Sequence, residues 1–225
     1  MRYLRIALWG TEQGNNIVKA LVNIGTKMDP INAKKMRSLT FDIGGNAITK
    51  EEFQQFEALS VFENLITFTF GAQGMQIEKG LSFVKNLKYL ENLTYYFGYC
   101  RLGVGRDFLT ELQDTNIRNL TLDLRGNDLN NGHADKLGKL CASMSLLQYS
   151  SIHLTGNSIE EKGASSLLDK FNKHQSLFAY DQKVKNSNPN LKSVTVTIDL
   201  RQNPLEEQEG KNLLKAASSY IDLRI

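Results

Sequence analysis

The sequence predicts an α/β fold in which short strand–turn–helix units stack into a solenoid, with a parallel sheet on one side and helices on the other. Three observations lead to this prediction. Short stretches of alternating apolar and polar residues, typical of half-buried strands, recur along the 225-residue chain. The clearest of these stretches end at an asparagine. Apolar residues after that position then recur every three or four residues, as on one face of an amphipathic helix.

The strands come first in each unit, and four copies are clear: residues 39–48, 120–129, 150–159 and 196–205. In each copy, apolar residues three and five positions upstream lead to an asparagine, namely Asn46, Asn127, Asn157 or Asn203. Three weaker copies have Thr11, Gln73 and Cys100 at this reference position, and residues 220–225 (YIDLRI) resemble the strand of a further copy cut short. Successive reference positions are separated by 35, 27, 27, 27, 30 and 46 residues, which indicates a repeat of 27–30 residues with two insertions.

Amphipathic helices are predicted after the four clear strands. Their apolar faces are Phe53, Phe56 and Leu59; Ala134, Leu137 and Leu140; Ala164, Leu167, Leu168 and Phe171; and Leu213, Leu214 and Ala217. A unit of this size cannot bury its apolar face alone, so it must stack on a neighbour. The insertions fall near residues 25–36 and 172–190, and the second, polar and containing SNPN, is predicted to be a surface loop. We expect residues 1–225 to form one domain.

A polar turn residue is physically required at the end of each strand. A chain that turns away from a sheet frees backbone groups that must be satisfied when they are buried. Asparagine carries one acceptor oxygen and two N–H donors, so it can bond an N–H and a C=O at once. Asn46, Asn127, Asn157 and Asn203 are therefore expected to have a structural role.

The pattern LxLxLxxNxL, followed by segments such as NNGHADKLGKL and EEKGASSLLDKF, resembles the leucine-rich repeat. The repeat length and the helical second half resemble its ribonuclease-inhibitor-like subclass. This resemblance implies a horseshoe of about seven repeats plus a partial one, with strands on the concave face and helices on the convex face. It also implies that the four asparagines form a hydrogen-bonded ladder between repeats. Cys100 occupies a position where the family accepts cysteine, whereas Thr11 and Gln73 depart from the pattern.

Polar strand residues are expected to share one surface, the concave face. One column of this surface is rich in hydroxyl groups: Arg5, Thr40, Thr67, Thr94, Thr121, Ser151 and Thr197. The high strand propensity of threonine is sufficient to explain it. The candidate partner-binding residues lie in two more varied columns: Trp9, Asp42, Tyr96, Asp123, Arg125, His153, Asp199 and Arg201. Alternatives remain open, because the charges can serve solubility or pair between neighbouring strands, and Trp9 can cap the first repeat.

The composition argues against several classes of function. A net charge of +3 is too small to indicate nucleic-acid binding, and no apolar run reaches the length of a membrane span. Cys100 and Cys141 imply no disulfide framework and favour a cytoplasmic location. None of the three histidines has metal-ligand spacing, and no nucleotide-binding or nucleophile motif is present. We therefore expect no enzyme activity and no cofactor.

The function expected from the sequence is that of a non-catalytic interaction or scaffold subunit in a larger protein assembly. It would bind protein partners through the concave face or through open solenoid ends, since Leu4 enters a strand almost at once and Ile225 ends within one. The alternative is a regulator of an enzyme, either a GTPase activator or an inhibitor, because both occur on this fold. A ribonuclease inhibitor should have an acidic concave face for its basic target, so the mixture of acidic and basic residues here disfavours that function. The form LTLDLxxN also resembles repeats of ciliary proteins, which suggests an axonemal complex.

Overall fold

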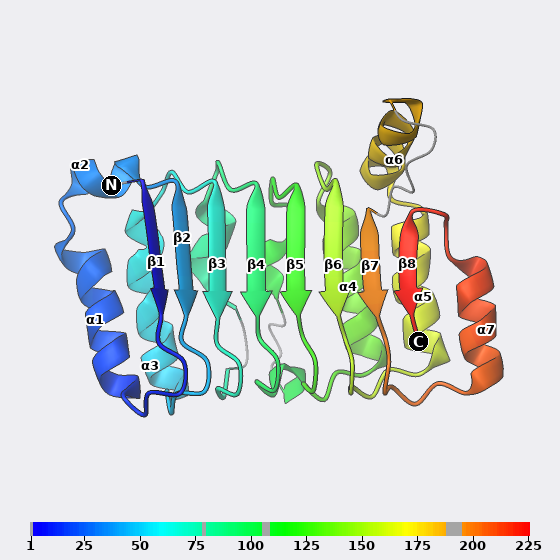
Figure 1. The fold of residues 1–225 in the computed structure, drawn as a ribbon, viewed down its shortest axis with the longest axis horizontal. Coiled ribbons are helices and arrows are strands. Elements are labelled where there is room, and N and C mark those ends of the chain that lie inside the picture. Colours follow the sequence, from blue (N-terminus) through cyan, green and yellow to red (C-terminus); the bar gives the residue numbers. More distant parts are fainter. Residues whose placement is uncertain (1, 78–79, 105–108, 188–194) are drawn as a thin grey trace.

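The computed structural model of the chain describes residues 2–77, 80–104, 109–187 and 195–225. Its central element is one sheet of eight parallel strands that lie side by side in chain order (Figure 1). The strands are β1 (Tyr3–Ala7), β2 (Ser38–Asp42), β3 (Thr67–Gly71), β4 (Asn92–Tyr96), β5 (Asn119–Asp123), β6 (Tyr149–His153), β7 (Val196–Asp199) and β8 (Ile221–Arg224). Each unit therefore places its strand next to that of the preceding unit, in the layout expected of a solenoid.

Helices connect the strands, and several of them cover one face of this sheet (Figure 1). They are α1 (Gly14–Lys27), α2 (Pro30–Lys35), α3 (Lys50–Gln54), α4 (Asn131–Ser143), α5 (Glu161–Asn172), α6 (Gln175–Ser187) and α7 (Glu207–Ala216). In Figure 1, α3, α4 and α5 lie behind the strands, and none of the helices in the described residues crosses in front of them. The front of the sheet, called the open face below, therefore presents its side chains to the surroundings.

The connections after β3 and β4 differ from the strand–turn–helix pattern that the sequence predicted for every unit. They contain 3₁₀ helices instead, η2 (Ser82–Asn86), η3 (Leu102–Val104) and η4 (Thr110–Leu112), and α3 itself continues as η1 (Gln55–Val61). These two connections have 20 and 22 residues, against 25 between β5 and β6. A 3₁₀ helix rises about 2.0 Å per residue against about 1.5 Å in an α-helix, so a shorter connection can still cross the layer.

The register of β3 corrects the sequence prediction by two residues. Thr69, not Thr67, lies opposite Thr40 of β2 and Thr94 of β4. The reference position of this unit is therefore Met75 rather than Gln73. A shift of two residues leaves every side chain on the same face of a strand, so alternation in ITFTFG could not separate the two registers.

The second insertion is helical, and the surface loop predicted for residues 172–190 is wrong over residues 175–187. These residues form α6, which stands above the start of the last strands in Figure 1. Leu177 and Asp181 are buried on one side of this helix, and Asp181 pairs with Lys185 at 2.7 Å. Buried residues four positions apart are typical of a helix. Because Asp181 is polar, the apolar residues of this segment alone do not show the helical spacing. Residues 188–190 lie outside the described part of the chain.

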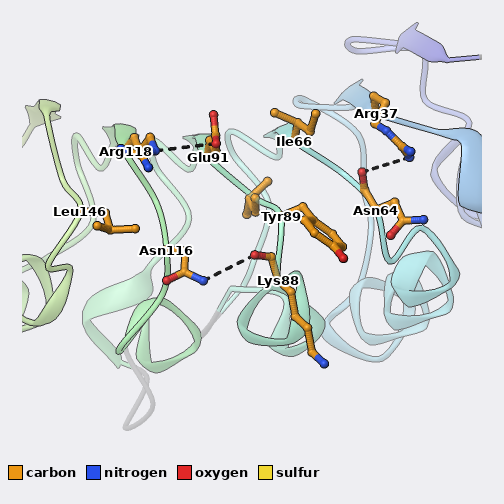
Figure 2. Close-up of a pocket in the computed structure, with 10 residues that line it drawn as sticks. Arg37, Asn64, Ile66, Lys88, Tyr89, Glu91, Asn116, Arg118 and Leu146 are labelled. Atoms are coloured by element: carbon orange, nitrogen blue, oxygen red, sulfur yellow. Dashed lines mark hydrogen bonds and ion pairs between the residues drawn. The ribbon is translucent and has the colours of Figure 1, made fainter.

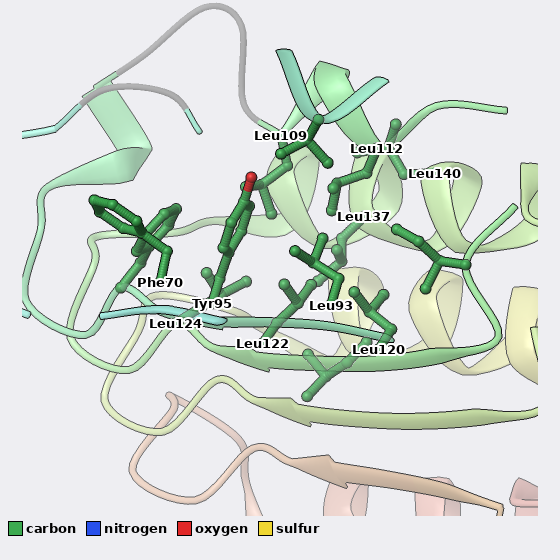
Figure 3. Close-up of a cluster of buried hydrophobic side chains, with 14 of the residues drawn as sticks. Phe70, Leu93, Tyr95, Leu109, Leu112, Leu120, Leu122, Leu124, Leu137 and Leu140 are labelled. Carbon is green, nitrogen blue, oxygen red and sulfur yellow. The ribbon is translucent and has the colours of Figure 1, made fainter. Parts of the chain in front are cut away.

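The core fills the space between sheet and helices. Figure 3 shows Leu120, Leu122 and Leu124 in and after β5 together with Leu137 and Leu140 of α4. All five are buried. The alternating leucines of each strand thus meet the helical face that follows them, which keeps the core continuous from unit to unit.

The four asparagines at the strand ends bond backbone groups of their own unit and of the preceding one. Asn127 Oδ1 accepts the N–H groups of Cys100 at 2.8 Å and Leu102 at 3.2 Å, and its Nδ2 donates to Phe97 O at 2.7 Å. Asn157 Oδ1 in turn accepts the N–H of Asn127 at 2.9 Å. These bonds join adjacent units at the turn where the sheet ladder ends, and they satisfy backbone groups that are buried there.

The first and last of these asparagines make equivalent bonds. Asn46 Oδ1 accepts the backbone N–H of Thr11 at 3.0 Å, and Asn203 Oδ1 accepts that of Ile159 at 3.0 Å. At the equivalent position of the fourth unit, Cys100 Sγ donates to Ala72 O at 3.0 Å. The thiol replaces one donor of the asparagine amide, whereas the side chain of Met75 in the third unit has no N–H or O–H to donate.

Candidate functional site

The open face carries a continuous row of polar and aromatic side chains over its second half. The strand register places Tyr96, Asp123, His153, Asp199 and Arg224 opposite one another on β4 to β8. We call these five residues the central row. Neighbouring parallel strands lie about 4.8 Å apart, so each member of the row is next to the following one.

Two buried aspartates of the central row fix exposed arginines. Asp123 Oδ1 accepts from Arg125 Nε at 2.8 Å, and Asp199 Oδ2 accepts from Arg201 Nη2 at 2.7 Å. The aspartate side chains are 7% and 3% exposed, whereas those of Arg125 and Arg201 are 48% and 58% exposed. The Arg201 hydrogen bond lowers the pKa of Asp199 despite its burial. Each aspartate is thus a buried support that orients a guanidinium towards the surroundings.

This pairing is within one unit, between the last residue of a strand and the residue two positions later, rather than between neighbouring strands as the sequence alternative supposed. The same arrangement recurs in β8, where Arg224 Nε donates to Asp222 at 2.9 Å. Residues i and i+2 project from the same face of a strand, which makes the contact local. The sequence analysis missed Asp222 and Arg224, although the D-x-R of YIDLRI repeats that of residues 123–125 and 199–201.

His153 is the middle residue of the central row, between Asp123 and Asp199. Ser151 Oγ and His153 Nε2 are 3.1 Å apart, and His153 Nδ1 is 4.0 Å from Asp199 Oδ2. This order of groups occurs in acyl-transfer sites, but the second distance exceeds that of a hydrogen bond. The N–H of Leu154 donates to Asp199 O within the sheet at 2.8 Å, so it is not available to an oxyanion. The cluster supplies hydrogen-bonding groups rather than an activated nucleophile.

Trp9 and Asp42 lie apart from the central row. Asp42 on β2 faces Gly71 on β3, so a residue without a side chain separates it from Tyr96 on β4. Trp9 is half exposed and packs its ring on Gly44 of the next unit, where a side-chain carbon would collide with the indole. The structure therefore brings together six of the eight candidate residues and leaves these two at the other end of the sheet.

Tyr99 is a further exposed aromatic residue beside the central row, and the sequence analysis did not single it out. Its ring lies against Gly126, which has a φ of +60° and no space for a side chain there. Tyr99 itself has a φ of +58°, an uncommon conformation for a tyrosine. The sequence indicates this position only by the order of residues, since Tyr99 directly follows Gly98 at the turn after the strand.

The two cysteines are buried and chemically protected. Desolvation raises the pKa of the Cys100 thiol and of the Cys141 thiol to about 12. A thiol with a pKa so far above the solution pH is present as thiolate only in a minute fraction, and the thiolate is the reactive form.

We therefore expect the native protein to resist alkylation by iodoacetamide at pH 8, whereas protein unfolded in guanidinium chloride reacts at both cysteines. Mass spectrometry of timed samples measures the two rates. Modification of either cysteine in the native protein at the rate of the unfolded one would contradict the buried positions. A Cys100→Ser, Cys141→Ser double variant serves as the unreactive control.

Metal coordination and membrane insertion find no support in the described residues. Within residues 2–77, 80–104, 109–187 and 195–225, no group of three or more His, Cys, Asp or Glu side chains could hold a metal ion. The helices in the same residues are all too short or too polar to cross a membrane. In comparisons with known proteins, no family model and no curated protein matches this sequence.

Proposed function

We propose that this chain is a leucine-rich-repeat protein of the ribonuclease-inhibitor-like type, with about seven repeats plus a partial one in a horseshoe. The recurring LxLxLxxN pattern supports the proposal, as do parallel strands in chain order. The hydrogen bonds of Asn46, Asn127, Asn157 and Asn203 to preceding units add further support. In such a horseshoe the open face is the concave face.

The proposed function is that of a non-catalytic interaction subunit of a larger protein assembly, in the cytoplasm or the ciliary axoneme. The observation that carries it is the central row, in which buried Asp123 and Asp199 hold the exposed guanidinium groups of Arg125 and Arg201 in place. Arginine and tyrosine are favoured at the energetic centres of protein interfaces. Side chains that are oriented before binding lose less entropy on association, so such a surface suits a folded partner.

Replacement of Asp123, Arg125 and Arg201 by alanine is expected to remove the partners that the wild-type protein captures from cell extract. Affinity capture followed by quantitative mass spectrometry measures the loss, and titration with each purified partner should show at least a tenfold weaker affinity. Melting temperature and circular dichroism establish that the variant is folded.

The matched control carries alanine at Asp135, Lys139 and Lys162, an acid and two bases on the helical side of the molecule. It should keep every partner. If the open-face variant also keeps them all, the open face is not the binding surface. A small GTPase that is captured by the wild-type protein, and whose nucleotide hydrolysis it accelerates, would instead favour the enzyme-regulator alternative.

A further inference from the structure

A groove of about 550 Å³ runs along the edge of the sheet where the strands begin, away from the open face (Figure 2). Its upper wall is formed by residues that directly precede strands: Arg37, Ile66, Glu91 and Arg118. Their backbones form a hydrogen-bonded series, with Ile66 N donating to Arg37 O at 2.8 Å and Arg118 N donating to Glu91 O at 2.9 Å. This wall therefore has the regular spacing of the sheet itself.

The second wall consists of residues that lie three positions before the first residue of a strand: Asn64, Tyr89, Asn116 and Leu146. Bonds to neighbouring units hold several of these side chains. Asn64 Nδ2 donates to Lys34 O at 2.9 Å, and Arg37 Nη1 donates to the same carbonyl at 2.8 Å. A groove whose walls are fixed before binding needs little ordering when a ligand enters.

The groove combines exposed apolar groups with an excess of positive charge. Tyr89 is 61% exposed and lies near its middle, and the exposed side chains of Ile66 and Leu146 belong to the same lining. Arg37 and Arg118 contribute two cations against one acid, Glu91, whereas the side chain of Lys88 points away from these residues in Figure 2. The pair between Arg118 and Glu91 is long, at 3.7 Å, and both partners are solvent-accessible, so a ligand carboxylate can displace it at small cost.

We propose that this groove binds an extended acidic peptide segment that contains an aliphatic or aromatic residue. The apolar side chain would cover Tyr89 between Ile66 and Leu146, and acidic side chains on either side would meet Arg37 and Arg118. A guanidinium has five N–H donors, and within the described residues Arg37 donates to the carbonyls of Lys34, Met36 and Asn64 through Nη1 alone, so the donors of Nε and Nη2 remain for a carboxylate. The groove spans strands β2 to β6, about 19 Å at the usual strand spacing, which an extended peptide of about six residues covers.

Selection from a displayed library of random octapeptides tests this proposal. The wild-type protein is the target, and the Arg37→Glu, Arg118→Glu double variant is the counter-target. We expect the enriched peptides to carry at least two Asp or Glu residues together with a Leu, Ile, Phe, Tyr or Trp. Fluorescence anisotropy with the synthesised peptides should show at least a tenfold weaker affinity for the double variant, and a similar loss for Tyr89→Ala.

Matched controls locate the site. A Lys162→Glu variant on α5 has the same kind of charge change and should bind within twofold of wild type, as should the open-face triple alanine variant. The proposal is overturned if no peptide is enriched, if enriched peptides lack acidic residues, or if the double variant binds them equally. Tighter binding of a labelled octauridylate than of any selected peptide, lost in the double variant, would assign the groove to single-stranded RNA instead.

Discussion

Replacement of Phe70 by alanine is expected to lower the free energy of unfolding by about 3–5 kcal/mol, the range for removal of a buried aromatic side chain. Phe70 is fully buried at the end of β3. Its ring packs edge-on against Phe41, Phe53, Phe56 and Phe97, with ring centroids 5.3–6.4 Å away. These partners come from the units before and after that of Phe70, so the cavity would loosen the contacts between three successive units.

Urea denaturation followed by circular dichroism measures this loss. Phe70→Leu serves as the control, because it keeps most of the volume and should lose clearly less stability than the alanine variant. An unfolding midpoint for Phe70→Ala within error of wild type would contradict the central position of this ring. A broadened transition would show that the units no longer unfold together, as solenoids with a weakened interface between repeats can do.

Replacement of Asn127 by alanine is expected to lower the free energy of unfolding by about 1–3 kcal/mol, because it leaves buried backbone groups unsatisfied. Asn127 is fully buried, and its amide accepts two N–H groups and donates to Phe97 O and Arg125 O. Asn127→Asp has nearly the same shape but cannot donate to these two carbonyls, so it should be destabilising as well. Loss of stability in both variants would assign the effect to hydrogen bonding rather than to volume.

Asn15→Ala is the matched control, since Asn15 is exposed on α1 and its replacement should change stability by no more than about 0.5 kcal/mol. Chemical denaturation of all three variants under identical conditions gives the comparison. An unchanged midpoint for Asn127→Ala would show that the turn finds other partners and would remove the physical argument for the asparagine positions.

The two proposed surfaces differ in how the fold builds them. On the open face, each charged group is placed by alternation along a strand and is supported by a residue two positions away, as Asp199 supports Arg201. At the edge groove, Tyr89 and Arg118 come from different units and line the same groove only because the strands stack in register. The two surfaces share no residue, so a variant of one is expected to leave the other unchanged.

The strands, their inward-facing residues and the positions of the turn asparagines follow from the sequence. Alternation with period two and a switch to helical spacing are local properties, so they are readable without knowledge of the neighbours. Leu120, Leu122 and Leu124 are buried as their alternation predicts. The aspartate–arginine pairs are local too, between residues two apart, whereas pairing between neighbouring strands was one alternative that the sequence left open.

Features that depend on contacts between units were determined by the tertiary structure. The register of β3 rests on its pairing with β2 and β4, because a shift of two residues leaves the alternating pattern unchanged. The burial of Asp181 could not be predicted from the sequence, since a polar side chain on the buried face of a helix interrupts the apolar periodicity of that face. The groove combines residues from Arg37 to Leu146 that no spacing in the sequence connects. The sequence thus determined the repeating unit, whereas stacking of the units determined which side chains became neighbours.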